Sequence, residues 1–139
     1  MAVDRSETIR WQGLKEFRLA LKELELNLER DLSRSHKAVA DVVARKARAK
    51  GAGLGSVAAK AAPSISASGV QLGARVVYGG AEFPFMYGAE FGAIRYPQFQ
   101  PWLGHEGYFL FPTIRETRDE TIAIYAAELE RITKKAFPD

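Results

Sequence analysis

The sequence predicts an α+β fold, with helices at both ends of the chain and a small antiparallel sheet between them. Apolar residues recur every three or four positions in the first third of the chain and again in its last part. Between those segments the period falls to two, with glycines and prolines interrupting it. Because a period of 3.6 is typical of helices and a period of two is typical of strands, we expect the elements in that order. A length of 139 residues suits one domain.

Residues 1–62 are expected to form a helical arm, since one face of the helical pattern carries regularly spaced apolar side chains. These are Leu14, Phe17, Leu21, Leu24, Leu28 and Leu32. The pattern pauses near Ser33–Ser35 and then resumes, so one helix of about 35 residues and two abutting helices are both compatible with it. A single helix of that length spans about 50 Å, which favours either a break or contact with a neighbouring molecule. We expect the glycine-rich segment Gly51–Ser56 to end the arm as a hinge.

Residues 63–112 are expected to hold a strand pair and a long aromatic loop. The alternating pattern from Ile65 to Tyr78 predicts a hairpin that turns near Leu72–Ala74. In the loop that follows, aromatic residues and prolines crowd together, which predicts an ordered segment that packs on its own domain or on a partner.

We expect short strands within this loop near Arg95–Phe99 and Tyr108–Phe111. Residues 113–139 are expected to form the C-terminal helix, with Pro112 in its first turn. Acidic residues early in this segment and basic residues late in it match the helix dipole.

Charge is unevenly distributed, although the net charge is only +3. The densest basic patch comprises Arg45, Lys46, Arg48 and Lys50. Such a patch is able to contact the phosphate backbone of DNA. A solvated helix face and a charged contact between subunits are the two other interpretations.

The residue inventory offers little for catalysis. The chain has no cysteine and only two histidines, which excludes disulfides and thiolate sites and leaves no spacing typical of a metal site. His105 and Glu106 are adjacent in a glycine-bounded turn without a nucleophile nearby, so we interpret them as turn residues. We therefore predict no catalytic, cofactor-binding or metal-binding residue. Since no apolar run is long enough for a membrane span or a signal peptide, we also expect no membrane contact and synthesis in the cytoplasm.

Four motifs occur in a recognisable order. A segment rich in Ala and Lys ends in a proline at Ala58–Pro63, and a strand pair follows over Ile65–Gly79. Next come the segment Pro84–Gly92, which contains Tyr-Gly-Ala-Glu-Phe-Gly, and then Gly107–Ile114, which leads into the final helix. In this order the last two-thirds of the chain resembles the tail-component family of long-tailed, lambda-like bacteriophages.

The resemblance implies a structural virion protein that forms a ring at the head–tail joint. It implies a homo-oligomer of six copies as the expected state, neighbouring neck and tail proteins as partners, and passing contact with viral DNA. It places the protein in the virion, and in the host cytoplasm during assembly. A tail terminator ring is the close alternative within the family, and a small DNA-binding module or a small hydrolase is the alternative outside it.

Two sets of residues are the candidates for these contacts. For DNA in the lumen they are the basic residues already named, Arg45, Lys46, Arg48 and Lys50. For contacts between subunits they are Phe83, Phe85, Tyr87, Glu90, Phe91, Trp102, Tyr108 and Phe109. Within the second set we expect Glu90 to pair with an arginine such as Arg95 or Arg115. The alternative interpretation makes Tyr87 and Phe91 ordinary core residues.

Overall fold

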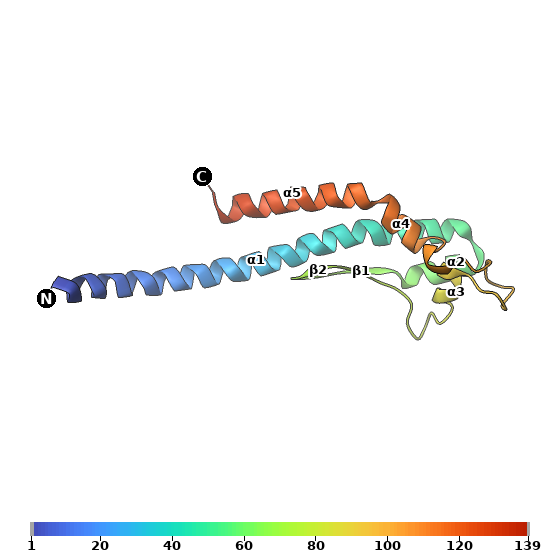
Figure 1. Cartoon of the computed structure of the whole chain (residues 1–139), viewed down its shortest axis with the longest axis horizontal. Coiled ribbons are helices and arrows are strands. Elements are labelled where there is room, and N and C mark those ends of the chain that lie inside the picture. The colour runs from blue at the N-terminus through green and yellow to red at the C-terminus, as the bar shows by residue number, and fades with distance from the viewer. Residues whose placement is uncertain (1, 139) are drawn as a thin grey trace.

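The computed structural model describes residues 2–138, with side chains described from Leu14 onward, and it has the predicted α+β fold. The elements run in the order α1 (Ala2–Leu54), α2 (Ser56–Ala61), η1 (Ala62–Ser64), β1 (Ser66–Val70), β2 (Gly73–Val77), α3 (Met86–Phe91), η2 (Gly104–Glu106), α4 (Leu110–Glu116) and α5 (Arg118–Ala136). The molecule is elongated because α1 runs along its whole length (Figure 1).

Helix α1 is one continuous element of 53 residues, so the break considered near Ser33–Ser35 does not occur. At 1.5 Å per residue it is about 80 Å long. The pause in the apolar pattern has a packing cause, since buried Ser35 donates a hydrogen bond to the Glu128 carboxylate of α5 at 2.9 Å. A serine that finds a partner on another helix no longer competes for the backbone of its own helix.

The hinge expected over Gly51–Ser56 is also displaced, because α1 continues through Gly51 and Gly53. The chain turns only at Gly55, whose φ of 71° lies in the left-handed region that glycine adopts without strain. Helix α2 then runs back to Ala61, where η1 follows, and α1 and α2 pack together through alanines.

The predicted hairpin is present and lies along α1. Strands β1 and β2 are antiparallel, with Ser66 opposite Val77 and Val70 opposite Gly73, so a two-residue turn connects them. Gly69 lies so close to the α1 backbone that a Cβ atom at this position would be 2.5 Å from the Lys37 backbone nitrogen. Glycine at this position therefore lets the hairpin lie directly on the helix.

The two short strands predicted within the aromatic loop are absent from the described structure. Residues Arg95–Phe99 form bends and turns, and only an isolated bridge between Ala93 and Pro101 ties that excursion together. Tyr108–Phe111 leads into α4, so helix begins at Leu110 rather than at residue 113. Proline at position 112 is accommodated in the first turn of α4, where backbone N–H groups have no partner within the helix.

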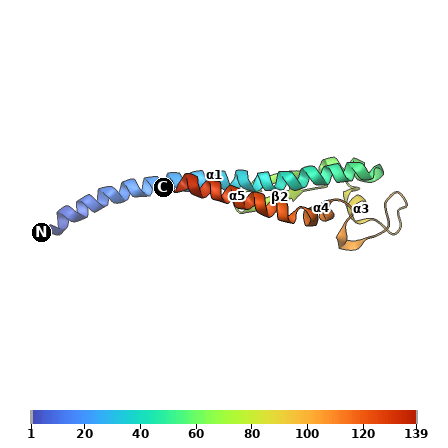
Figure 2. The same ribbon diagram turned by 90° about the horizontal axis from the view of Figure 1, so that it is seen from above.

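Helix α5 lies beside α1 and runs back along it, joined to α4 by a bend at Thr117 (Figure 2). Two ion pairs, Lys135–Asp31 at one end and Lys46–Glu120 at the other, connect the helices. Between them lies the Ser35–Glu128 hydrogen bond. The pKa of the Glu128 carboxyl is held below its ordinary value by hydrogen bonds from Arg131 and, to a lesser degree, from Ser35.

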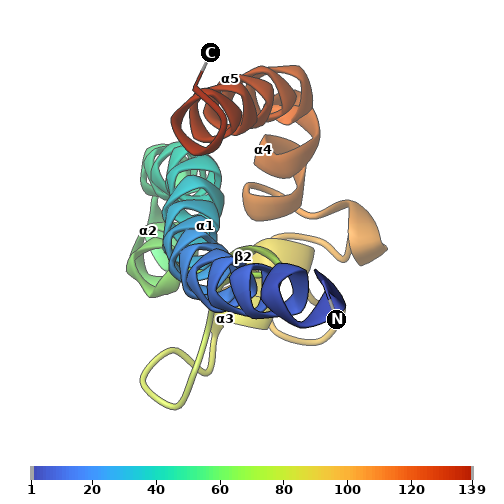
Figure 3. The same ribbon diagram turned by 90° about the vertical axis from the view of Figure 1, so that its left-hand side faces the viewer.

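The core lies at the C-terminal end of α1, where α2, the hairpin, α3 and α4 meet. Seen along the long axis, α1 lies between α5 on one side and the hairpin with α3 on the other (Figure 3). The buried core residues are Ala44, Ala47, Ala61, Ala62, Ile65, Met86, Ala89, Phe109 and Leu110. Five of these are alanines, so helices approach closely and the few large side chains fill the space that remains.

Substitutions at Gly51 and Gly53, in the last turns of α1, test how closely the helices pack in this core. A Cβ atom at Gly51 would lie 2.8 Å from the Phe109 ring and 2.9 Å from the Ala62 Cβ, whereas a Cβ atom at Gly53 would meet nothing within 4 Å. We expect Gly51→Ala to lower the free energy of unfolding by about 1–3 kcal/mol through overpacking. Gly53→Ala, the matched control, should raise it by up to about 1 kcal/mol. Urea denaturation measures both, and equal effects would contradict this account of the core.

Candidate assembly surfaces

The aromatic segment folds mainly over the protein's own core. Of the residues predicted to contact a neighbouring subunit, Glu90 and Phe109 are fully buried within the chain, which removes both from the surface of a single copy. Phe83, Phe85 and Tyr108 are partly buried against the core.

The remaining predicted contact residues lie further out. Phe91 packs against Tyr87 and Phe111, whereas Tyr87 is 63% exposed and Trp102 is 55% exposed. The described structure therefore leaves only Tyr87 and Trp102 of the predicted set as outward aromatic side chains. The interpretation of Phe91 as a packing residue fits its half-buried position better than a role on an open surface.

Glu90 does not pair with an arginine, contrary to expectation. Its carboxylate accepts hydrogen bonds from the backbone N–H groups of Leu110 at 2.7 Å, Phe111 at 3.1 Å and Phe109 at 3.3 Å. These N–H groups begin α4 and have no partner within that helix, so the carboxylate of α3 caps α4. Arg115 instead donates to the Glu106 carbonyl at 2.7 Å.

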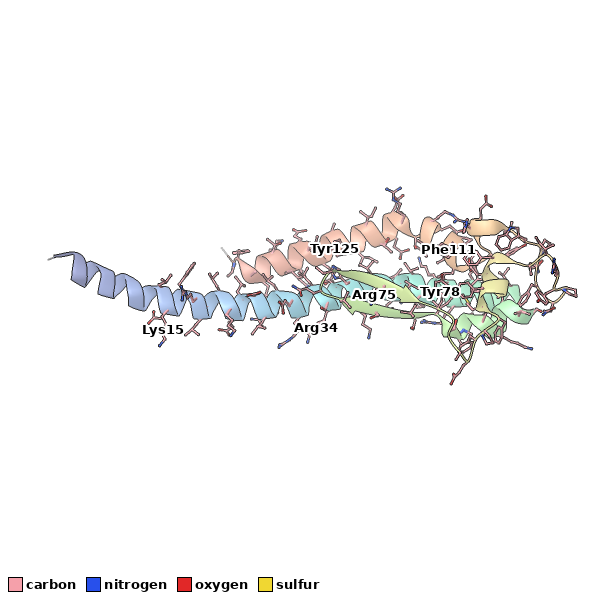
Figure 4. The ribbon with its side chains drawn as sticks, turned by 60° about the horizontal axis from the view of Figure 1, so that its bottom comes forward. Lys15, Arg34, Arg75, Tyr78, Phe111 and Tyr125 are labelled. Atoms are coloured by element: carbon pink, nitrogen blue, oxygen red, sulfur yellow. The ribbon has the colours of Figure 1, made fainter. Side chains whose placement is uncertain are left out.

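Gly88 and Gly92 let the loop between α3 and α4 close tightly. The Phe99 ring packs on Gly88, and Gly92 has a φ of 81° and lies against the backbone of Pro101. Beside this loop, burial raises the pKa of the Tyr78 phenol above its ordinary value, with Tyr87 and Glu90 adding to the shift. Figure 4 shows Tyr78 close to Phe111, consistent with the edge contact between their rings.

The predicted basic patch is divided among different faces of α1. Lys46 pairs with Glu120, and Lys50 pairs with Glu116 at 2.7 Å, so both hold the C-terminal helices to α1. Arg48 donates to the Ile65 carbonyl at 2.7 Å, where the chain enters β1. Only Arg45 of the four projects as an exposed residue without such a tie.

Arg45 belongs instead to a basic stripe that sequence analysis did not single out. The stripe is exposed and follows steps of three, four and eight along α1, which places its members on one face: Arg30, Arg34, Lys37 and Arg45. Asp41 lies among them and reduces the charge. Arg34 lies on the side of α1 turned away from α5 (Figure 4).

The apolar face predicted for the helical arm is left uncovered on the N-terminal half of α1. Helix α5 ends beside Leu24 and Leu28, where Ile132 and Ala136 contact this region. Beyond that point α1 continues alone (Figures 1 and 2). Its side chains Leu14, Phe17 and Leu21 are 40%, 59% and 47% exposed.

An apolar groove lies between the hairpin turn and α5. It encloses about 440 Å³ and is lined by Val39 and His36 of α1, by Leu72 to Ala74 of the hairpin, and by Ile122, Tyr125, Ala126 and Leu129 of α5. Leu72 is 94% exposed, Ile122 54% and Leu129 37%.

His36 fixes the walls of this groove. Its Nδ1 lies 2.6 Å from the Val70 carbonyl oxygen, and its Nε2 lies 2.9 Å from the Tyr125 hydroxyl. Because a carbonyl oxygen only accepts, Nδ1 carries the proton, and this N–H donates a hydrogen bond to the Val70 carbonyl oxygen. The ring also stacks on Tyr125. One buried histidine thus ties the hairpin and α5 to α1 and sets the distance between them.

The described residues include no cluster of three or more His, Asp or Glu side chains that could hold a metal ion. His105 and Glu106 are exposed in the short helix η2, as expected for turn residues. Among the described helices, none combines the length and the apolar character that crossing a bilayer requires.

Comparison of the chain with protein-family models, with curated protein sequences and with solved structures found no match. The resemblance to phage tail components therefore stands on the motifs alone.

The cap on α4 yields a stability prediction. Glu90→Gln keeps the side-chain shape but turns an amide NH₂ toward backbone donors, so at least one buried N–H loses its acceptor. We expect the free energy of unfolding to fall by about 2–3 kcal/mol, since hydrogen bonds to a charged acceptor contribute about 1.5–3 kcal/mol. Urea denaturation measures this. Glu82→Gln at an exposed position is the control, expected within about 0.5 kcal/mol of the parent. If both changes had the same small effect, the cap would not matter for stability.

Proposed function

We propose that this chain is a structural subunit of a ring at the head–tail joint of a long-tailed bacteriophage, and that it acts by binding rather than by catalysis. The observation that carries the proposal is the apolar face of α1, which runs past the end of α5 and has no cover within the described chain. Exposed apolar surfaces of this kind are typical of protein–protein contacts. An uncovered face together with a separate apolar groove suits a subunit that touches a neighbour on each side, as subunits of a ring do.

The family assignment within this proposal is supported by the four motifs. Their segments coincide with α2 and η1, the hairpin, α3, and the start of α4, and each of these contributes residues to one core. The motif residues include Glu90, which caps α4. A motif set that specifies a single core is the kind of signal that a shared fold would leave in sequence. The tail terminator ring is the alternative position for the same kind of subunit.

The location of the chain tests the proposal directly. We expect the protein in purified virions, at the junction of head and tail, as a closed ring of six copies. Cryo-electron microscopy of intact particles locates the density, and native mass spectrometry of the purified protein counts the copies. Density at the tail-proximal side of the joint would favour the terminator. A chain that is absent from virions, or that stays monomeric beside neighbouring neck and tail proteins, would refute the ring.

DNA affinity separates this proposal from a dedicated DNA-binding module. The basic stripe offers four exposed cations, Arg30, Arg34, Lys37 and Arg45, with one carboxylate among them. Each neutralised phosphate contributes about 0.9 to the slope of log affinity against log salt concentration. We therefore expect weak binding of duplex DNA by the isolated chain, with a slope no steeper than about four. Fluorescence anisotropy across a salt series measures it. Tight binding with a much steeper slope, lost in Arg34→Glu, would favour the DNA-binding alternative.

A further inference from the structure

We propose that the arm of one copy, defined as residues 14–23 of α1, lies in the hairpin–α5 groove of a second copy. This inference rests on the proposed function, in which copies of the chain associate, and it names the two surfaces through which they do so. It does not require that the ring belong to a phage.

The arm has the composition of a helix that docks through one face. Leu14, Phe17 and Leu21 follow steps of three and four, and they continue the stripe on which Ile132 of α5 packs against Leu24 and Leu28. The face of α1 that binds a helix within the chain thus extends about two further turns without one. Phe17, 59% exposed, is its largest side chain and the natural anchor.

The groove has the character of a site that a helix covers. Leu72 stands in the two-residue hairpin turn and is 94% exposed, although such turns favour Gly, Asn and Asp. Across the groove, Ile122 and Leu129 are seven residues apart on α5, which is two helical turns. An apolar stripe two turns long matches the spacing from Leu14 to Leu21 on the arm.

The second copy is the occupant that both surfaces favour. The described chain carries both an apolar helical face and an apolar groove on separate parts of the molecule, and the spacing from Leu14 to Leu21 equals that from Ile122 to Leu129. Joining them head to tail covers both surfaces in every copy, and such heterologous contacts close into rings. A contact made by only a few helical turns buries less than the roughly 800 Å² per partner of a typical stable pair, so ring closure would add to its stability.

Charge substitutions in the arm test the contact in the full chain. We expect Phe17→Glu to convert assemblies to monomers at a concentration where the parent protein is assembled, as measured by sedimentation velocity. Leu19→Glu is the matched control. Leu19 is 61% exposed, close to the value for Phe17, but two positions along a helix place it on nearly the opposite face. Equal loss of assembly in both variants would overturn the proposal. Circular dichroism confirms that each variant keeps its helices.

Mixing distinguishes the groove from contact between two arms. Leu72→Glu blocks the groove and leaves the arm intact. We expect Phe17→Glu and Leu72→Glu to be monomeric separately. A mixture should form a heterodimer through the one intact arm and the one intact groove, at concentrations above those at which the parent protein assembles, because ring closure no longer adds to the stability of the contact. If Leu72→Glu assembles like the parent protein, the groove is not the site. If the mixture stays monomeric, the two surfaces do not pair.

The absence of cysteine permits an independent check by cross-linking. An oxidant should link a Phe17→Cys chain to a Leu72→Cys chain, and should not link Phe17→Cys chains to each other. Efficient linkage between two Phe17→Cys chains would show arm-to-arm contact and overturn the proposal. If the parent protein forms rings at the head–tail joint but none of these variants affects them, this inference fails while the proposed function survives.

Discussion

The fold depends on one buried carboxylate. Glu90 has no exposed surface, and its two oxygens accept from three successive backbone N–H groups at the start of α4. Its own backbone carbonyl accepts from Tyr108 N–H at 2.7 Å. Helix α3 is therefore joined to the start of α4 through both the backbone and the side chain of Glu90. A buried charge is tolerated only where several donors replace water, and the unpaired end of a helix supplies them. Because α5 follows α4, this cap also sets where α5 begins along α1.

Small residues give α1 its second constraint. On one side α1 presents Ala44, Ala47 and Gly51 to α2 and to Phe109, and Gly69 of the hairpin touches its backbone directly. On the other side it meets α5 through ion pairs and through Ser35, with His36 joining α5 to the hairpin. Packing on two sides supports α1 from about Leu24 to its C-terminal end, while its N-terminal part has no such support from the described chain. The C-terminal part of α1 therefore belongs to the core, whereas its N-terminal part forms the arm.

The sequence predicted the element types well where one physical signal acts alone. Periodicity of 3.6 placed α1 and α5, and alternation between Ile65 and Tyr78 placed the hairpin. The errors arose where long-range contacts decide. Gly51 and Gly53 look like a hinge but lie inside α1, because Gly51 makes room for Phe109, more than fifty residues away. Tyr108–Phe111 has strand composition, yet the Glu90 cap starts a helix there. Lys46 and Lys50 look like half of a phosphate patch, but their partners on α4 and α5 are not visible from spacing. For the arm, the signals in the sequence were the apolar stripe through Leu14, Phe17 and Leu21 and the excess length of the helix.

The apolar side chains of the described chain fall into a buried set and an exposed set. Aromatic residues, which sequence analysis assigned to the contact between subunits, are mostly used inside the chain, where Phe109 is fully buried and Phe83 and Phe85 pack on the core. Phe17 and mainly aliphatic residues remain outside, on the arm and around the groove, at exposed positions where substitution usually changes the free energy of unfolding little. Side chains that the monomer does not need for its own stability, and that lie on one helical stripe and along one groove, are most simply explained by a second molecule. The groove, lined mainly by Leu, Ile, Val and Ala side chains, would offer such a molecule an apolar surface rather than polar partners.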